Sequence, residues 1–117
     1  MILPPDNIKV YLALGSTDMR KSIDGLSILV SEQLELDPLS KHLFAFCNRK
    51  RNIVKILYWD RNGFCLWHKR LETDSFQWPI SKEETMTITT RELAWLMEGL
   101  SIHQKNAHKP LKYSEVY

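Results

Sequence analysis

The chain has 117 residues, which suits one domain and is too short for two well-packed ones. Hydrophobic residues make up 44% and charged residues 26%, which excludes a globally disordered chain, and no apolar run approaches the roughly 18 residues that a membrane span needs. The net charge of +2 is too small to indicate nucleic-acid binding by itself. The first residues lack the basic and apolar regions of a secretory signal, so we expect a cytoplasmic protein without a membrane partner.

Segments typical of strands alternate with two segments typical of helices. Residues 8–15 predict a first strand, because they are rich in β-branched and aromatic side chains. Residues 17–35 predict a helix, because apolar side chains recur every three or four positions and form one stripe: Met19, Ile23, Leu26, Val30 and Leu34. Further strands are predicted at 42–48, 53–60, 64–72, 76–79 and 85–89. A second helix over 89–99 is predicted from a capping box of Thr89 with Glu92 and from the terminal Gly99.

This order of elements predicts an α+β fold in which an antiparallel meander of about four to six strands carries both helices on one face. If the loop between the second and third strands is centred on Lys50, the covered face carries five apolar residues: Phe44, Phe46, Ile56, Tyr58 and Trp67. We expect Trp67 to be buried near its centre. Residues 1–100 are assigned to this single domain, and 101–117 to a basic tail that we expect to be flexible.

The stretch KILYWDRNGFCLWHKRLE, residues 55–72, predicts a hairpin that combines aromatic and basic side chains. Asn62-Gly63 suits a two-residue hairpin loop, whose central positions need positive φ. This loop places Lys55 opposite Arg70, and like charges directly across a sheet repel each other. Either a carboxylate such as Glu72 relieves the repulsion within the protein, or an anionic partner relieves it.

The basic side chains of the hairpin and of the preceding loop, NRKRN, form a candidate DNA-binding surface. Arg and Lys hold phosphate and exposed rings stack on bases, although charged loop tips also serve solubility alone. The candidate DNA-binding residues, expected as one continuous strip, are Arg49, Lys50, Arg51, Lys55, Arg61 and Arg70. The alternative is a protein-docking surface that consists of Leu57, Trp59 and Phe64.

The sequence predicts no catalytic residues, no metal site and no cofactor. It lacks a Gly-rich phosphate loop, a nucleophile elbow and an HExxH pair. Asp18, Asp24 and Asp60 are candidate metal-binding acids, but no pattern brings them together. Cys47 and Cys65 fall on opposite faces in the predicted register, so we expect no disulfide between them, and their spacing suits no zinc site.

Four segments, TDMRKSIDGL, HLFAFCNRKR, IVKILYWDRNGFCLWHKRLE and FQWP, resemble in order and spacing the TnpB-type accessory proteins of the insertion-sequence sixty-six family of bacterial transposable elements. Arg61 is a departure, because a small turn residue is expected there. The resemblance implies a short, non-catalytic protein that is encoded beside a separate transposase and needed for efficient transposition. The implied partners are that transposase and other accessory proteins of the element, and the basic residues add DNA at the element ends as an expected partner.

Overall fold

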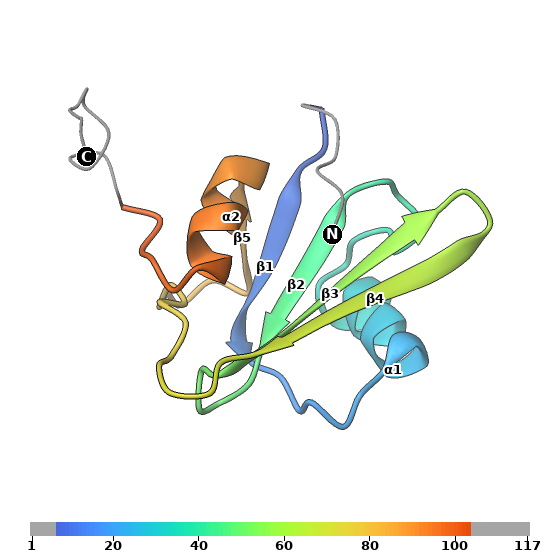
Figure 1. Cartoon of the computed structure of the whole chain (residues 1–117). Coiled ribbons are helices and arrows are strands. Elements are labelled where there is room, and N and C mark those ends of the chain that lie inside the picture. Colours follow the sequence, from blue (N-terminus) through green and yellow to red (C-terminus); the bar gives the residue numbers. More distant parts are fainter. Residues whose placement is uncertain (1–6, 104–117) are drawn as a thin grey trace.

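The computed structural model describes residues 7–103, which form an α+β fold of five strands and two helical segments (Figure 1). The predicted fold class is confirmed. The basic tail predicted at 101–117 lies outside the described residues except for 101–103. In chain order the elements are β1 (Val10–Ser16), α1 (Ile23–Ile28) with its π-helical continuation η1 (Leu29–Gln33), β2 (Leu43–Cys47), β3 (Ile53–Asp60), β4 (Gly63–Arg70), β5 (Thr85–Ile88) and α2 (Thr90–Met97).

The five strands form one mixed sheet in the order β4-β3-β2-β1-β5 (Figure 1). Strands β1 and β2 run parallel, and the other neighbouring pairs are antiparallel. The predicted all-antiparallel meander is therefore wrong in its first connection. The chain between β1 and β2 contains α1 and η1, and a connection of this kind returns the chain to the end of the sheet where β1 began.

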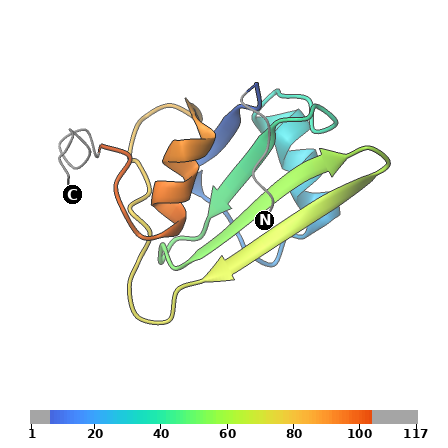
Figure 2. The ribbon, with the colours of Figure 1, turned by 45° about the horizontal axis from the view of Figure 1, so that its top comes forward.

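The two helices cover opposite faces of the sheet, as Figure 2 shows, so the predicted single covered face is wrong. We call these the α1 face and the α2 face. Successive strand residues point to alternate faces, and each inner strand therefore supplies both sides. The buried residues of the α1 face are Ala13, Leu26, Val30, Phe44, Phe46 and Leu57. Those of the α2 face include Val10, Leu12, Ala45, Val54, Ile56, Leu93 and Leu96.

The register of β2 against β3 explains why Phe44 and Phe46 lie on the α1 face instead of the predicted one. Phe44 pairs with Leu57, one residue further along β3 than the predicted loop implied. Because side chains alternate along a strand, a shift of one residue reverses the face of the whole strand. Within the loop that sets this register, Arg51 adopts a positive φ of 62°.

The β3–β4 hairpin turns one residue earlier than predicted, at Arg61-Asn62, with Asp60 opposite Gly63. Arg61 supplies the positive φ, 58°, although a glycine would adopt it with less strain. The pairing shifts by two residues, which preserves the faces. Trp67 therefore stays on the predicted face, opposite Ile56 instead of the predicted Tyr58, but it is half-buried instead of buried. Lys55 lies opposite His68 and not opposite Arg70, so the predicted repulsion does not arise.

The segment between β1 and α1 is a turn and not the predicted first turn of a helix. The Thr17 amide donates to the Cys47 carbonyl at 2.8 Å, which extends the β1–β2 pairing past Ser16. The Lys21 amide donates to the Asp18 carbonyl at 3.1 Å, and the helix starts only after Ser22. The predicted apolar stripe is nevertheless confirmed, because all five of its residues belong to the α1-face cluster.

The second helix matches its prediction, whereas the predicted strand at 76–79 is absent. Thr89 and Glu92 form the capping box, and Gly99 has a φ of 84°. Phe76 and Trp78 are buried in an irregular segment instead, and the Trp78 indole Nε1 donates to the Ala13 carbonyl at 2.9 Å. Within residues 7–103, no helix has both the length and the apolar character to cross a membrane.

Candidate functional site

Two lysines of the β3–β4 hairpin hold the helical segments against the sheet. Lys55 is buried on the α1 face, where its Nζ donates hydrogen bonds to the carbonyl oxygens of Met19 and Lys21, both at 2.9 Å. Lys69 lies on the α2 face, and its Nζ donates to the Met97 carbonyl at 2.7 Å. Met97 ends α2, so the ammonium also complements the negative end of the helix dipole. Lys55, predicted as a DNA contact, is therefore not on the surface.

The loop after β2 presents Arg49 and Lys50 to solvent but turns Arg51 inward. The side chain of Asn48 organises this loop: its Oδ1 accepts from the amides of Asn52 and Ile53, both at 3.0 Å. Arg51 is half-buried, and its Nη1 donates to the Asn48 carbonyl at 3.5 Å. Arg49 and Lys50 are exposed, so they remain available to a partner.

The predicted continuous strip is broken into two groups. Arg61 is exposed at the hairpin tip, whereas Arg70 pairs across from Ile53 at the opposite end of the hairpin. Seven steps along a strand at about 3.3 Å each separate these ends by roughly 23 Å. Arg61 is therefore remote from Arg49, Lys50 and Arg70.

Two cations that the sequence reasoning did not include lie at the same end of the sheet as Arg49 and Lys50. The turn after β1 carries Arg20 and Lys21, both exposed, and Ser16 at the end of β1 pairs with Cys47 just before the Arg49 loop. Figure 1 shows the ends of β1, β2 and β4 together at the bottom of the view. We call this group the cationic end, which consists of Arg20, Lys21, Arg49, Lys50 and Arg70.

Carboxylates moderate the charge of the cationic end. Asp18 accepts hydrogen bonds from the Arg20 side chain, the shortest at 2.6 Å, and the pair holds the pKa of Asp18 at about 2. Arg70 Nε contacts Glu72 Oε2 at 3.2 Å, and both side chains are largely exposed. Glu72 thus pairs with Arg70, although the Lys55–Arg70 repulsion that it was expected to relieve does not arise. Among the described residues, Lys21, Arg49 and Lys50 form no ion pair with a carboxylate, so they carry most of the free positive charge.

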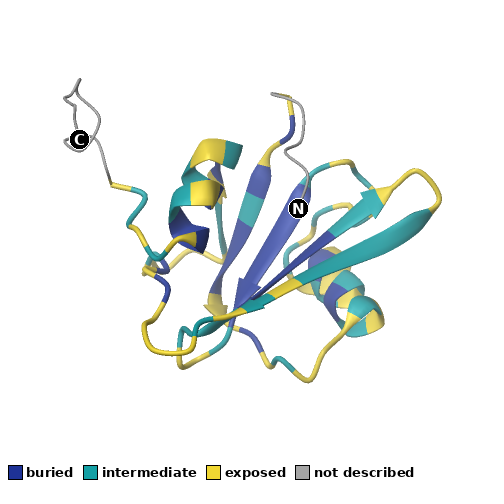
Figure 3. Cartoon of the chain, in the orientation of Figure 1, coloured by how far each residue is buried: buried dark blue, intermediate teal, exposed yellow. Residues whose placement is uncertain are grey.

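The predicted docking residues divide between core and surface. Leu57 is fully buried beneath α1 and is not available to a partner. Trp59 and Phe64 face each other near the hairpin tip, with ring centroids 5.0 Å apart in an edge-to-face arrangement. Both are half-buried, and Figure 3 shows the outer part of this hairpin in the intermediate colour. Only this aromatic pair remains of the predicted docking surface.

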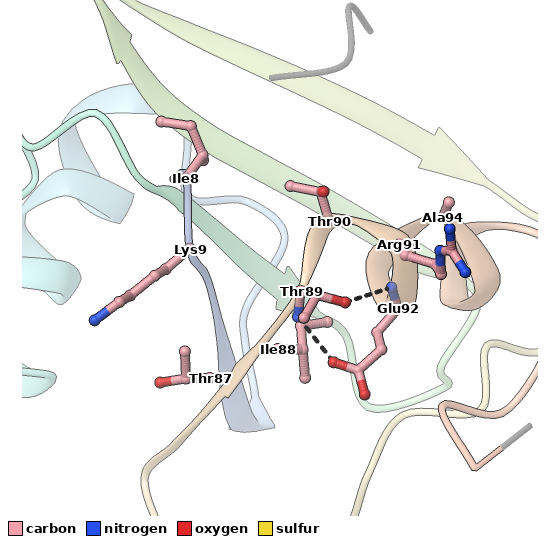
Figure 4. A pocket seen from close by; sticks show the side chains of 9 residues that line it. All are labelled: Ile8, Lys9, Thr87, Ile88, Thr89, Thr90, Arg91, Glu92 and Ala94. Atoms are coloured by element: carbon pink, nitrogen blue, oxygen red, sulfur yellow. Dashed lines mark hydrogen bonds between the residues drawn. The ribbon is translucent and has the colours of Figure 1, made fainter. Parts of the chain in front are cut away.

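A hollow of about 770 Å³ lies where the start of β1, the end of β5 and the start of α2 meet (Figure 4). Lys9 and Arg91 line it but extend to opposite sides. The capping box satisfies two backbone amides at the start of α2: Thr89 Oγ1 accepts from the Glu92 amide at 3.1 Å, and the Glu92 carboxylate accepts from the Thr89 amide at 2.8 Å. This arrangement places a negative charge at the helix terminus and does not favour an anion there.

The acidic residues and thiols do not gather into a metal-binding group within residues 7–103: no three His, Cys, Asp or Glu side chains lie close enough to share an ion. Both cysteines are free. Cys47 and Cys65 lie on the same face of the sheet, contrary to the prediction, because the register of β2 differs by one residue. Burial raises the pKa of the Cys47 thiol, and the nearby Arg51 guanidinium opposes that shift.

Comparison with known proteins identifies the family. The family model described as IS66 Orf2 like protein matches residues 8–107. The chain belongs to this family. Membership in the IS66 Orf2-like family indicates an accessory role in the transposition of an insertion sequence. The family is not known as a catalytic one. The resemblance that the sequence motifs indicated is confirmed.

Relatives of the IS66 Orf2-like chain occur in Sinorhizobium fredii (strain NBRC 101917 / NGR234). A protein named uncharacterized protein y4hO is 34% identical over 113 residues, which cover 96% of this chain and 98% of the relative. A second, uncharacterized protein y4jC, is 29% identical over 115 residues, with the same shares covered. No solved structure matches the chain.

Proposed function

We propose that this IS66 Orf2-like protein acts in transposition without catalysing a reaction, by binding the DNA of its element through the cationic end. The observation that carries the proposal is the convergence of basic side chains from three separate segments: the turn after β1, the loop after β2 and the end of β4. Arg and Lys neutralise backbone phosphates and release counterions, and this electrostatic contribution supplies most of the affinity of non-specific DNA binding.

The geometry of the cationic end supports backbone contact and offers little for reading bases. Its exposed groups are flexible cations on loops and on a strand end, and within residues 7–103 no helix projects from it into a groove. Phosphate contacts fix position and carry no sequence information directly. Affinity for element-end and random duplexes is therefore expected to be nearly the same.

The proposed non-catalytic role agrees with the chemistry that a strand-cleaving enzyme requires. Such an enzyme uses acidic residues to hold two metal ions. Asp18 is engaged with Arg20, and among the described residues no group of three potential ligands shares a site. A separate transposase would then perform the strand cleavage.

The test is a binding titration on element-end and random duplexes at several salt concentrations. Replacing Arg49 and Lys50 together by Ala should reduce the slope of log affinity against log salt by about 2, one for each phosphate contact. Arg61→Ala is the matched control, because it removes one exposed cation at the far end of the hairpin and should leave the slope unchanged. Absence of wild-type binding at low salt, or an equal loss in both variants, would contradict the proposal.

The Trp59–Phe64 pair supports a second candidate function, which is docking of the transposase without direct DNA contact. Trp is a frequent anchor of protein interfaces, and this ring is half-exposed on a projecting hairpin. Trp59→Ala should weaken binding to the purified transposase by about 2 kcal/mol or more. An apolar contact of this kind should also keep most of its affinity at high salt, which separates it from phosphate binding.

A further inference from the structure

Strand β4 is an edge of the sheet, and its residues from Phe64 to Trp67 form an apolar run. It has eight residues, whereas β5 at the other edge has four. Within residues 7–103 no further strand pairs with its outer side (Figures 1 and 2). The residues from Phe64 to Trp67 are all half-buried, in contrast to β2, which is buried at every position. Proteins usually shorten, charge or cover such an edge, because its free backbone groups pair readily with another strand.

The hairpin register determines which backbone groups of β4 are free. The loop has two residues, so its flanking pair, Asp60 with Gly63, carries the hydrogen bond of the turn. Hydrogen-bonded and non-hydrogen-bonded pairs alternate from there along an antiparallel ladder. The residues whose N–H and C=O groups point away from β3 are therefore Phe64, Leu66, His68 and Arg70.

A second copy of the same strand can satisfy all of these groups. An antiparallel partner must place outward-pointing residues opposite each other. The two-fold arrangement that uses the whole set pairs Phe64 with Arg70 of the second copy, and Leu66 with His68 of the second copy. Trp67 then lies on the two-fold axis, opposite its own equivalent.

The side chains of β4 suit this self-pairing. Phe64 receives a guanidinium from the second copy, which is a favourable cation–π contact. On the α2 face, Cys65 lies opposite Lys69, so no like charges face each other across the new ladder. The exposed tip with Arg61 also approaches the end of the opposing strand, which the exposed Glu72 and Asp74 follow. The same strand thus supplies both halves of a complementary contact, as a two-fold interface requires.

We propose that two copies of this chain associate through their β4 strands into one continuous sheet, with Trp67 on the two-fold axis. The pairing covers the half-buried aromatic side chains that the isolated chain leaves in contact with water. Of the cationic end it uses Arg70 alone and leaves Arg20, Lys21, Arg49 and Lys50 exposed, so a failure of dimerisation and a failure of DNA binding can be told apart.

Sedimentation of the purified full chain over a range of concentrations tests the proposal. The wild type should show a monomer–dimer equilibrium. His68→Pro removes one outward-pointing N–H without breaking a bond to β3, and an edge strand tolerates proline at such a position. This variant should dimerise at least tenfold more weakly, whereas the matched control His68→Ala keeps the amide and should dimerise like the wild type. Circular dichroism would establish that both variants are folded.

A cross-linking variant tests the register independently of the proline. Lys69→Cys places a thiol opposite the native Cys65 of the second copy, in a non-hydrogen-bonded pair whose Cα separation of about 4.5 Å allows a disulfide. Mild oxidation should give a disulfide-linked dimer, whereas Lys50→Cys, with an exposed thiol away from β4, should not. The proposal is overturned by a wild type that stays monomeric throughout or by an undiminished His68→Pro dimer. A wild-type Cys65–Cys65 cross-link would likewise refute Trp67 on the axis.

Discussion

Lys55 and Lys69 show how basic residues in an aromatic hairpin can serve the fold. Each ammonium group points from a strand toward backbone carbonyls of the helical layer on its own face of the sheet. Lys55 holds the turn that precedes α1, and Lys69 holds the end of α2. The two lysines differ in role from the exposed arginines, because backbone carbonyls of the protein accept their hydrogen bonds and their charge is not offered to a partner.

Lys55→Met should lower the free energy of unfolding by about 2–3 kcal/mol, because it leaves two carbonyls without a charged donor. Lys69→Met removes one such bond at a half-buried site and should cost about 1 kcal/mol. Urea denaturation of both variants measures the difference. Equal stability of Lys55→Met and the wild type would show that the buried ammonium does not hold the turn.

The parallel pair β1–β2 is joined at its start by the side chain of His42. Its Nδ1 accepts a hydrogen bond from the Lys9 amide at 3.0 Å, and its ring meets Tyr11 edge-on with centroids 5.8 Å apart. Burial lowers the pKa of His42, and the cations of Lys9 and Lys41 lower it further. Only the unprotonated ring can accept the Lys9 bond, so protonation would loosen the contact between the two strands.

The stability of the fold should therefore decrease as the pH falls below the ordinary His pKa of about 6.5. In that range the unfolded chain binds a proton at His42 more readily than the folded chain does, so unfolding is favoured; above it the ring is neutral in both states and the effect vanishes. Denaturation midpoints at pH 7.5 and 5.5 should differ less in His42→Gln than in the wild type. Identical differences would assign the pH dependence to other groups.

The whole molecule is a single sheet between two apolar clusters, and its thiols report on the two levels of burial. Cys47 is fully buried in the α2-face cluster, whereas Cys65 is half-buried on the edge strand β4. Reaching Cys47 requires separation of the sheet from α2, which amounts to unfolding the domain. Reaching Cys65 requires only local exposure at the edge.

An alkylating reagent should consequently modify Cys65 first, and Cys47 at a rate that follows global unfolding. The raised pKa of the Cys47 thiol slows its reaction further, since the thiolate is the nucleophile. Mass spectrometry over a labelling time course in increasing urea would separate the two sites. Comparable rates for both cysteines in native buffer would show that the α2 face opens without unfolding.

The sequence by itself determined the α+β class, the apolar stripe of the first helix, the capped second helix and the two faces of the β3–β4 hairpin. These features depend on local periodicity and capping, which neighbouring residues encode. The family could also be identified from the sequence, because its motifs are continuous segments of the chain. The exposed part of the candidate site was also accessible this way, since loop residues such as Arg49 and Lys50 stay in solvent regardless of how the strands pair.

Only the tertiary structure decided the parallel pairing of β1 with β2, the opposite placement of the helices and the face of Phe44 and Phe46. A one-residue difference in the register of β2 against β3 reversed that face, because strand side chains alternate with a period of two. The same long-range packing buried Lys55 beneath the Met19–Lys21 turn and brought Arg20 and Lys21 to the cationic end. Such contacts join residues more than 30 positions apart, and no local pattern in the sequence specifies them.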